Sequence, residues 1–392
     1  MSEASIVDIT PFLAKHQLPL KYQYLSEQFF IPLAHDILES KKNNTPIFVA
    51  INGCQGSGKT TLADFLVTWF SNNTPFTSVA LSIDDFYLSK AHRQGLAKDV
   101  HPLFATRGVP GTHDVGLMNT TISRLLAKEV GVPLPKFDKH HDDCSPEQTW
   151  QCNNKPIDII ILEGWCVGSE PQPLFSLSEP INELETQHDK EGVWRRCVNS
   201  CLANEYKSVF SKIDYTVMLK APSFEDVFKW RQEQEQKLIA AKGEGDGTMS
   251  DEQLVHFISH FERITRENLN TLSAKANALI ELDSNRDISA MHLTSDDTLQ
   301  PIIFTDLDGT LLDHADYNTK NISSLLQDLQ AAHIPVVFNT SKTFCEVVEL
   351  KNELNIQQPF IVENGAAAYL PVDYFELKPI GCTQVGAYWC YA

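Results

Sequence analysis

The sequence has no apolar run that approaches the ~20 residues needed to span a bilayer. Its first residues also lack a basic segment followed by an apolar one, which disfavours a secretory signal peptide. These two absences argue against the common routes into or across a membrane. We therefore expect a cytoplasmic protein with no membrane partner.

Basic residues are scarce, since 32 Lys and Arg face 51 Asp and Glu and leave a net charge of −19. This balance disfavours nucleic acid as a partner, because contacts to its phosphates need clustered Lys and Arg. The nine cysteines form no C-x-x-C pair, so they indicate neither a zinc site nor a disulfide framework. The 392 residues are nevertheless enough for two domains with their own cores.

One glycine-rich stretch carries the strongest functional signal. Residues 53–60 read Gly-Cys-Gln-Gly-Ser-Gly-Lys-Thr, which fits the G-x-x-x-x-G-K-T pattern of a phosphate-binding loop. The apolar run at 47–51 predicts a buried parallel strand before it, and residues 61–67 have helical spacing. In such a loop the backbone N–H groups and the helix N-terminus face a polyphosphate.

Within this motif, Lys59 can reach the β- and γ-phosphates, and the Thr60 hydroxyl can bind Mg²⁺. The sequence therefore predicts a nucleoside triphosphate site. Its predicted residues are Gly53, Gln55, Gly56, Ser57, Gly58, Lys59, Thr60 and Thr61.

Apolar strand candidates alternate with helical stretches from residue 46 to about residue 285. This alternation predicts an α/β fold with a doubly wound parallel sheet. The strand candidates are residues 47–51, 79–81, 157–162, 215–219 and 278–282. We predict a nucleotide-binding domain over residues 1–285, a linker over 286–300, and a second, partial α/β segment over 301–392.

Two of these predicted strands end in carboxylates. Asp84 and Asp85 follow the strand at 79–81, and Glu163 ends the apolar run at 158–162. Side chains at the carboxyl ends of strands face the ligand crevice of a doubly wound sheet. A carboxylate there can accept the proton of an attacking hydroxyl or help to place Mg²⁺. The alternatives are a helix N-cap for the aspartates and a solvated turn for Glu163.

The loop, the L-S-x-D-D-F-Y stretch and the strand before Glu163 resemble the P-loop kinases of the phosphoribulokinase, uridine kinase and pantothenate kinase group. Within this group the sequence is most similar to the D-glycerate 3-kinase family, over most of residues 25–285. Further supporting segments are T-R-G-V-P-G-T-H-D at 106–114, P-K-F-D-K at 135–139, W-R at 194–195, W-R-Q-E-Q-E at 230–235 and F-E-R-I-T-R at 261–266. Phe137 departs from the family pattern, where a tyrosine is expected.

The resemblance implies Mg²⁺-dependent transfer of the γ-phosphoryl group of ATP to a hydroxyl of D-glycerate. It implies that Asp84 is the general base, that Glu163 completes the metal site with Thr60, and that Arg231 lies on a lid over the phosphates. Another small acceptor, such as a nucleoside or a pantothenate-like acid, and a regulatory nucleotide-binding module without transfer chemistry are the alternatives.

Glycerate is a small anion, so its carboxylate needs fixed hydrogen-bond donors. Arg107 offers a bidentate fork and His113 a further donor, although Arg107 also fits a charge on a loop surface. The predicted substrate contacts in this domain are Asp85, Tyr87, Arg107, His113 and Asp114.

A second active-site pattern begins near residue 302. An apolar strand runs into Asp306-Leu307-Asp308-Gly309-Thr310, which resembles the haloacid dehalogenase (HAD) phosphatases and, within them, mannosyl-3-phosphoglycerate phosphatase. The resemblance implies that Asp306 attacks phosphorus and that Asp308 protonates the leaving group, with both at a metal site. It also implies that Thr340 binds the phosphate.

In that family, a lysine that neutralises the phosphate and an acidic metal-binding loop follow a cap domain, and residues 301–392 contain neither. Without them Mg²⁺ has too few ligands, and Asp306 faces a phosphate dianion. We therefore expect this segment alone to have no phosphatase activity, either as the front part of a longer gene product or as a docking remnant.

Overall fold

The structure is a computed structural model, in which the chain forms two compact units over residues 1–296 and 297–392. Each unit is described by itself. The residues that the structure describes are 10–16, 18–42, 44–242, 249–294, 302–312, 322–323, 325–326, 329, 334–354, 356, 358–372 and 382–392.

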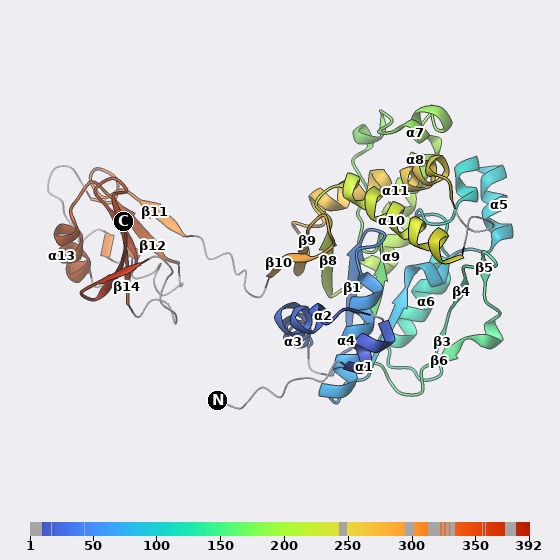
Figure 1. Ribbon diagram of the computed structural model, residues 1–392, viewed down its shortest axis with the longest axis horizontal. Coiled ribbons are helices and arrows are strands. Elements are labelled where there is room, and N and C mark those ends of the chain that lie inside the picture. Colours follow the sequence, from blue (N-terminus) through green and yellow to red (C-terminus); the bar gives the residue numbers. More distant parts are fainter. Residues whose placement is uncertain are drawn as a thin grey trace. The chain divides into compact units, whose positions relative to one another are not determined.

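The first unit is built on a six-stranded sheet with the order β10-β9-β8-β1-β7-β2 (Figure 1). Five strands run parallel, and β10 pairs antiparallel with β9 at one edge. The strands are β1 (Ile47–Gly53), β2 (Ser78–Ser82), β7 (Ile159–Gly164), β8 (Tyr215–Lys220), β9 (Ala278–Leu282) and β10 (Ile288–Leu293).

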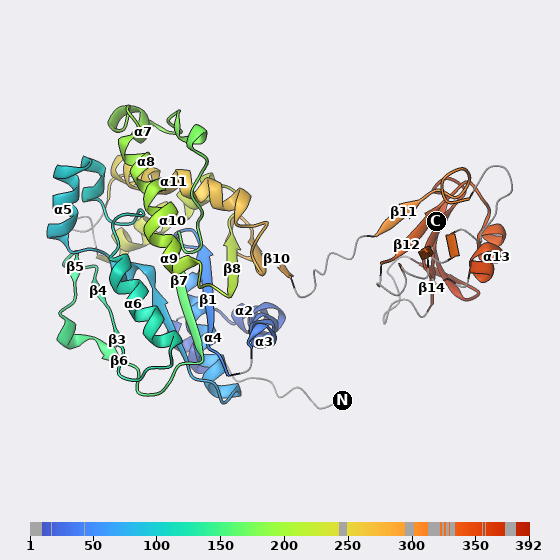
Figure 2. The same cartoon turned by 180° about the vertical axis from the view of Figure 1, so that it is seen from behind.

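Strand β1 is buried along its whole length, because helices cover both faces of the sheet (Figures 1 and 2). Successive side chains of a strand point to opposite faces. Ile47, Val49 and Ile51 accordingly pack into one apolar cluster with helices α3 and α4, whereas Phe48 and Ala50 pack into another with α6 and α8. The near-continuous apolar sequence of β1 reflects this two-sided burial.

The helices of this unit include two long ones, α10 and α11, that follow β8 in the chain. Short π-helical turns, η1 (Ser26–Phe30) and η6 (Leu202–Tyr206), interrupt two of the helical stretches. The α-helices are α1 (Thr10–His16), α2 (Lys21–Leu25), α3 (Ile31–Ser40), α4 (Lys59–Asn73), α5 (Lys90–Asp99), α6 (Val115–Leu126), α7 (Glu183–His188), α8 (Val193–Cys201), α9 (Lys207–Phe210), α10 (Phe224–Lys242) and α11 (Asp251–Thr271).

Smaller elements complete the connections of the first unit. Two short hairpins pair β3 (Pro133–Leu134) with β6 (Gln151–Cys152), and β4 (Phe137–Asp138) with β5 (Asp143–Cys144). The 3₁₀ turns are η2 (Ile83–Phe86), η3 (Pro102–Ala105), η4 (Glu147–Thr149) and η5 (Leu174–Leu177).

This architecture confirms the predicted α/β fold and the five predicted strand regions. The predicted linker over 286–300 is wrong in part, because residues 288–293 form β10 on the edge of the sheet. An edge strand has one partner and one face to solvent, so its mixed polarity resembles that of a loop. Residues 295–300 lie outside the described part of the chain.

The second unit has a six-stranded sheet with the order β11-β12-β13-β14-β16-β15. The first three strands are parallel, and the other three join them in antiparallel pairs. Its elements are β11 (Ile303–Thr305), β12 (Val336–Asn339), α13 (Phe344–Leu354), β13 (Phe360–Val362), β14 (Ala367–Pro371), β15 (Thr383–Val385) and β16 (Tyr388–Tyr391). In neither unit do the described residues form a helix with the length and apolar character of a membrane span.

Candidate active site

The phosphate-binding loop, residues 53–60, connects β1 to α4. Gly58 has a φ of +93°, a left-handed conformation that suits glycine, and it directly precedes the first residue of α4. A Cβ on Gly53 would lie 2.6 Å from Oγ of Ser57, so the turn leaves no space for a side chain there. The loop therefore curls in front of the N-terminus of a 15-residue helix, where backbone N–H groups can bind an anion.

Two buried polar atoms of this loop have no hydrogen-bond partner in the described part of the chain, namely Oε1 of Gln55 and Oγ of Ser57. The Lys59 side chain lies back over the loop, and its Nζ donates a 3.0 Å hydrogen bond to the carbonyl of Cys54. Burying a polar atom without a partner costs free energy. The loop therefore fits a strongly polar ligand, such as the phosphates of a nucleotide.

Glu163 lies where the central strands of the sheet end. It is buried, and in register it pairs with Ile51 of β1 on one side and with Ser82 of β2 on the other. Its Oε1 accepts a 3.0 Å hydrogen bond from the Thr60 hydroxyl. The two side chains thus present adjacent hard oxygen donors, the type that Mg²⁺ prefers.

No group of three or more His, Cys, Asp or Glu residues that could hold a metal occurs in the described ranges. A Mg²⁺ ion beside Thr60 and Glu163 would therefore take its other ligands from phosphate oxygens and water. Mg²⁺ commonly binds in this way, because it gives up its water reluctantly.

The carboxylate of Asp84 is fixed by two donors. The Tyr87 hydroxyl donates a 2.7 Å hydrogen bond to Oδ1, and Lys139 Nζ donates one of 2.7 Å to Oδ2. Burial of Asp84 disfavours its charge, but the charge and hydrogen bond of Lys139, together with the hydrogen bond from Tyr87, lower its pKa below the ordinary value. Burial and the neighbouring Asp84 raise the pKa of Tyr87, so its hydroxyl stays protonated and remains a donor.

A cavity of about 220 Å³ brings these groups together. Both Lys59 and Asp84 line it, so the cation of the phosphate-binding loop and the fixed carboxylate face the same space. Its other lining residues are Gln55, Thr60, Tyr87, Arg107, Lys139, Glu163, Gly164, Trp165, Arg231, Phe257 and Phe261. The cavity can hold a small polar molecule. A hydroxyl group of that molecule could lie between the Asp84 carboxylate and a phosphate bound beside Lys59.

Arg107 lines this cavity from a loop that is tightly packed at the next residue. Gly108 has a φ of +133°, and a Cβ there would lie 2.5 Å from the ring of Phe261 on α11. The Trp165 indole donates a 2.8 Å hydrogen bond to the Gly108 carbonyl. The Arg107 guanidinium forms an ion pair with Asp142. These contacts hold the guanidinium at the edge of the cavity.

Arg231 reaches the cavity from α10. Its guanidinium forms a 2.9 Å ion pair with Glu235, one turn further along the helix, and lies 6.0 Å from the ring centre of Phe257 on α11. Since Arg231 also lines the cavity, its charge lies within reach of a ligand beside Lys59.

Three predicted substrate contacts do not line this cavity. Asp85 pairs with Lys136 at 2.6 Å and accepts a bond from the Phe137 N–H, so it anchors the β4 region. Asp114 caps α6 by accepting a 2.8 Å hydrogen bond from the Leu117 N–H. The sequence prediction failed here because the direction of each side chain depends on distant packing partners.

The third residue, His113, stacks its ring on that of Tyr87, with ring centres 4.7 Å apart. Its Nδ1 lies 2.5 Å from the hydroxyl of Tyr206, which also accepts a bond from the Gly111 N–H. Burial lowers the pKa of His113 to about 4, so the ring is neutral at pH 7. His113 therefore does not line the cavity as a donor to the substrate, as the sequence predicted, but packs against Tyr87.

A second cavity, of about 590 Å³, opens on the other side of the phosphate-binding loop. Its walls include residues 56–61, Tyr22 of α2 and Arg286 of the turn between β9 and β10. An ion pair between Lys21 and Asp287 joins α2 to that turn. Because this cavity and the 220 Å³ cavity share Lys59 and Thr60, a nucleotide bound at the loop could extend into it.

In the second unit, the predicted phosphatase residues follow β11 and β12. Asp306 is exposed, and its Oδ1 accepts a 2.7 Å bond from the Leu307 N–H. Asp308 forms a 2.9 Å ion pair with Lys342, and Oγ1 of Thr340 accepts a 3.2 Å bond from the Lys342 N–H. The structure thus brings Asp308 and Thr340 together through a lysine.

Sequence reasoning missed several residues of these sites. Lys342 lies only two residues beyond Thr340, and this spacing was the available signal. Trp165, Phe257 and Phe261 form apolar walls of the active cavity, and nothing in their local sequence separates them from ordinary core aromatics. Lys139 belongs to the P-K-F-D-K segment quoted for the family resemblance, but it is 55 residues from Asp84, and only the fold shows that the two side chains pair.

Comparisons with known proteins match the two units separately. Over 268 residues the chain is 35% identical to the uncharacterized kinase mug58 of Schizosaccharomyces pombe, covering 65% of this chain and 94% of that protein. It is 29% identical over 239 residues to a chloroplastic D-glycerate 3-kinase of Arabidopsis thaliana, covering 59% of this chain and 49% of that protein. The solved D-glycerate 3-kinase of Cryptococcus neoformans var. grubii shares the fold, with a TM-score of 0.56, 22% identity, and coverage of 70% of this chain and 99% of that one.

Residues 303–377 match the family of haloacid dehalogenase-like hydrolases. This region is 48% identical over 87 residues to a glucosyl-3-phosphoglycerate/mannosyl-3-phosphoglycerate phosphatase of Persephonella marina, covering 22% of this chain and 32% of that protein. The chain thus spans about half of the plant kinase and about a third of the phosphatase. The matches confirm both predicted resemblances.

Proposed function

Because this chain belongs to the family of P-loop kinases that includes the fission-yeast kinase, we propose that its first unit transfers the γ-phosphoryl group of ATP to a hydroxyl of D-glycerate. The observation that carries the proposal is that Lys59 and Asp84 line the same cavity. A charged phosphate ligand and a hydroxyl-bearing acceptor can meet there.

In the proposed reaction, residues 53–61 bind the triphosphate of ATP through backbone N–H groups, and Lys59 balances charge on its terminal phosphates. The adenosine lies in the cavity beside Tyr22 and Arg286. Thr60 and Glu163 would hold Mg²⁺, which would supply neutralisation of charge on the phosphates. Phosphoryl transfer depends mainly on this positioning and on electrostatic stabilisation.

Asp84 is the proposed general base. Its lowered pKa keeps it ionised, so it can accept the proton of the glycerate hydroxyl as the bond to phosphorus forms. Tyr87 and Lys139 hold the two carboxylate oxygens in place. Precise placement of a base matters, because small misplacements cost large factors in rate.

Glycerate is favoured as the acceptor by the charges of the cavity. Arg107, Lys139 and Arg231 line it together with Lys59, which supplies cations for a carboxylate as well as for phosphates. A neutral nucleoside would leave these charges with fewer partners. A pantothenate-like acid is the competing acceptor that the same charges admit.

The proposal is tested by measuring ATP consumption with D-glycerate, L-glycerate, uridine and pantothenate at saturating Mg²⁺, with the product identified by phosphorus NMR. We expect D-glycerate to raise turnover far more than the other compounds. If ATP turnover does not respond to D-glycerate but does respond to another acceptor, the substrate assignment is wrong. If no acceptor works and Asp84→Asn changes no measurable output, the chain is a regulatory nucleotide-binding module.

For the second unit, we propose that Asp306, Asp308 and Thr340 belong to a phosphatase-type site that is inactive in this 392-residue chain. The match to phosphatases covers only 32% of the related protein. Lys342 is paired with Asp308 rather than with Asp306, and a phosphate dianion at Asp306 would need a cation beside it.

A further inference from the structure

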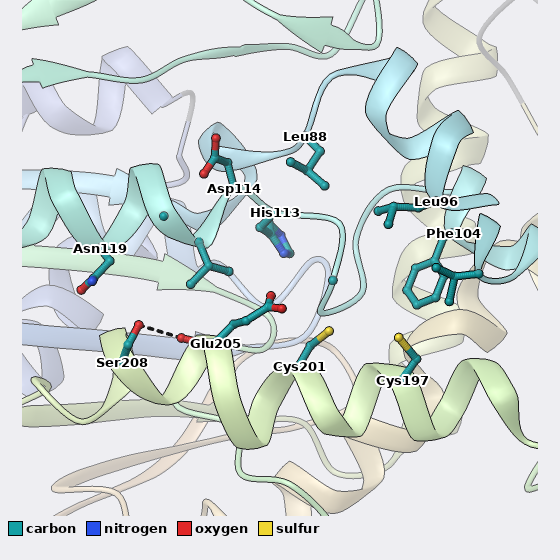
Figure 3. A pocket seen from close by; sticks show the side chains of 14 residues that line it. Leu88, Leu96, Phe104, His113, Asp114, Asn119, Cys197, Cys201, Glu205 and Ser208 are labelled. Carbon is teal, nitrogen blue, oxygen red and sulfur yellow. Dashed lines mark hydrogen bonds between the residues drawn. The ribbon is translucent and has the colours of Figure 1, made fainter. Parts of the chain in front are cut away.

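A third cavity, of about 590 Å³, lies in the first unit between the segment before α6 and the helical stretch formed by α8, η6 and α9. Figure 3 shows the side chains that line it, with Cys197, Cys201, Glu205 and Ser208 along one face of that helical stretch. Leu88, Leu96, Val100, Phe104 and Val115 supply apolar walls. Its volume lies in the range of about 300–1,000 Å³ that is common for small-molecule sites.

This cavity is separate from the active site. None of its lining residues lines the 220 Å³ cavity or the cavity beside Tyr22. It is therefore not an extension of the space that the kinase substrates would occupy.

The charges around the third cavity are opposite to those of the active site. Its lining residues include Asp114 and Glu205 but no lysine or arginine. His113 also lines the cavity, and its ring is neutral at pH 7 because burial lowers its pKa to about 4. An anion such as ATP, glycerate or phosphoglycerate would face two carboxylates and no lining lysine or arginine, whereas a cation would be attracted.

Glu205 supplies the negative charge for this attraction, from a side chain that is exposed to solvent. It belongs to the π-helical turn η6, and turns of this type are frequent at functional sites. The Glu205 side chain extends from the helix toward His113 (Figure 3). Its carboxylate makes no hydrogen bond or ion pair in the described part of the chain, although Asp114 on the opposite wall is occupied in capping α6.

An occupant of this cavity would touch the support of the catalytic base. His113 forms part of the wall, stacks on Tyr87, and has a buried Nε2 without a partner in the described residues. Tyr87 in turn donates its hydroxyl to Asp84. A shift of the His113 ring would therefore be passed to Asp84 through one aromatic ring.

We propose that this cavity is a second ligand site, which takes a small organic cation with an apolar body and lets its occupant alter the rate of phosphoryl transfer. The apolar body packs against Leu96, Val100 and Phe104, and the cationic group pairs with Glu205. The proposal that a ligand binds here depends only on the cavity. The proposal that this ligand alters the rate rests on the proposed kinase function.

Binding is tested with three probes of nearly equal shape, namely benzylamine, benzyl alcohol and benzoate. The readout is the rate at which iodoacetamide alkylates Cys197, measured by peptide mass spectrometry on the full chain. Cys197 suits this purpose because a hydrogen bond from Cys201 lowers its pKa and raises its reactivity. Cys152, which is exposed and outside the cavity, is the internal control.

We expect saturating benzylamine to slow alkylation of Cys197 at least threefold and to leave Cys152 unchanged. Glu205→Gln should raise the half-saturating benzylamine concentration at least fivefold and leave that of benzyl alcohol unchanged. Glu147→Gln, which alters an exposed acid away from the cavity, should change neither. Protection by benzoate equal to that by benzylamine, or no effect of Glu205→Gln, would overturn the site.

The rate effect is tested by measuring kcat with D-glycerate in the presence and absence of benzylamine. We expect a change of at least twofold that disappears in Val100→Trp, which fills the cavity from a residue that is 41% exposed and should tolerate the larger ring. Protection of Cys197 without any change in kcat overturns the regulatory role. If D-glycerate is not phosphorylated at all, the kinase proposal fails, while the alkylation data still decide the binding site.

Discussion

The Thr60 hydroxyl donates a 3.0 Å hydrogen bond to Glu163, and this contact joins the first turn of α4 to the end of β7. The two residues are 103 positions apart in the chain. Their oxygens form the part of the candidate active site that best fits Mg²⁺.

We predict that Glu163→Gln raises the Mg²⁺ concentration needed for half-maximal kinase activity by about tenfold, because an amide oxygen attracts the hydrated cation less than a carboxylate does. Thr60→Val should act in the same direction, and Thr60→Ser, which keeps the hydroxyl, should restore most of the activity. The measurement is a Mg²⁺ titration at fixed ATP. Equal Mg²⁺ requirements in the wild type and Glu163→Gln would contradict the assignment.

Asp84→Asn should lower kcat by about 10²–10⁴-fold, since general base catalysis commonly contributes factors of this size. The Kd for ATP should change little, because Asp84 contacts Tyr87 and Lys139 rather than the phosphate-binding loop. The neighbouring Asp85→Asn is the matched control, and it should cost far less, because Asp85 binds Lys136 outside the cavity. Steady-state kinetics and ATP-binding calorimetry separate the two effects. Similar losses of kcat in both variants would refute the role of Asp84.

Lys139→Met should move the acidic limb of the kcat/KM profile to higher pH. In the wild type, Lys139 and the Tyr87 hydrogen bond together oppose burial and hold the pKa of Asp84 below its ordinary value of 3.8, so the base stays ionised down to low pH. Without Lys139, burial dominates and raises that pKa, so protonation of the base begins at a higher pH. Lys136→Met, which removes the partner of Asp85, should leave the limb in place. An unchanged limb in Lys139→Met would show that another group controls it.

The stability of the first unit should rise with pH between about 4 and 6.5. His260 is buried on α11, and burial lowers its pKa from 6.5 to about 4 in the folded protein. The unfolded chain therefore binds more protons in this window, and the stabilisation is full above pH 6.5 and is lost as the pH falls toward 4. The difference between the two pKa values corresponds to at most about 3 kcal/mol.

His260→Leu should accordingly reduce, but not abolish, the pH dependence of the free energy of unfolding between pH 4 and pH 7, because buried His113 has a similarly lowered pKa. The measurement is urea denaturation across this range. The exposed His92 gives the control variant His92→Leu, which should keep the wild-type slope. A wild-type slope in His260→Leu would mean that His113 or other groups account for the dependence.

The second unit should release no phosphate from mannosyl-3-phosphoglycerate in the 392-residue chain. Asp306 is exposed, and the nearby cation Lys342 is paired with Asp308. Asp306→Asn should leave phosphorylation of D-glycerate unchanged. Phosphate release by the wild type that disappears in Asp306→Asn would contradict the proposal that this site is inactive.

The positions of residues 53–60, Asp84 and Glu163 at one edge of the sheet could be predicted from sequence, because each follows or ends a predicted parallel strand. Their positions follow from the general rule that the carboxyl ends of parallel strands meet at one edge. The motif defines the spacing within the loop. The rule for parallel strands predicts that Asp84 and Glu163 lie beside this loop, without knowledge of the rest of the fold.

Asp85, His113 and Asp114 could not be predicted in the same way. They lie in irregular segments whose side-chain directions depend on partners such as Lys136, Tyr206 and the start of α6. The third cavity was also beyond sequence reasoning, since its two sides come from segments about 90 residues apart that meet only in the folded chain.

The lack of space at Gly108 limits how the acceptor specificity of the proposed reaction can be engineered. Even a methyl group there would collide with Phe261, which packs on Trp165, and Trp165 in turn binds the Gly108 carbonyl. Each of these three residues thus contacts the other two, and a side chain at position 108 needs a smaller residue at position 261. Libraries that aim to change the acceptor of the proposed reaction should therefore vary Gly108 and Phe261 together.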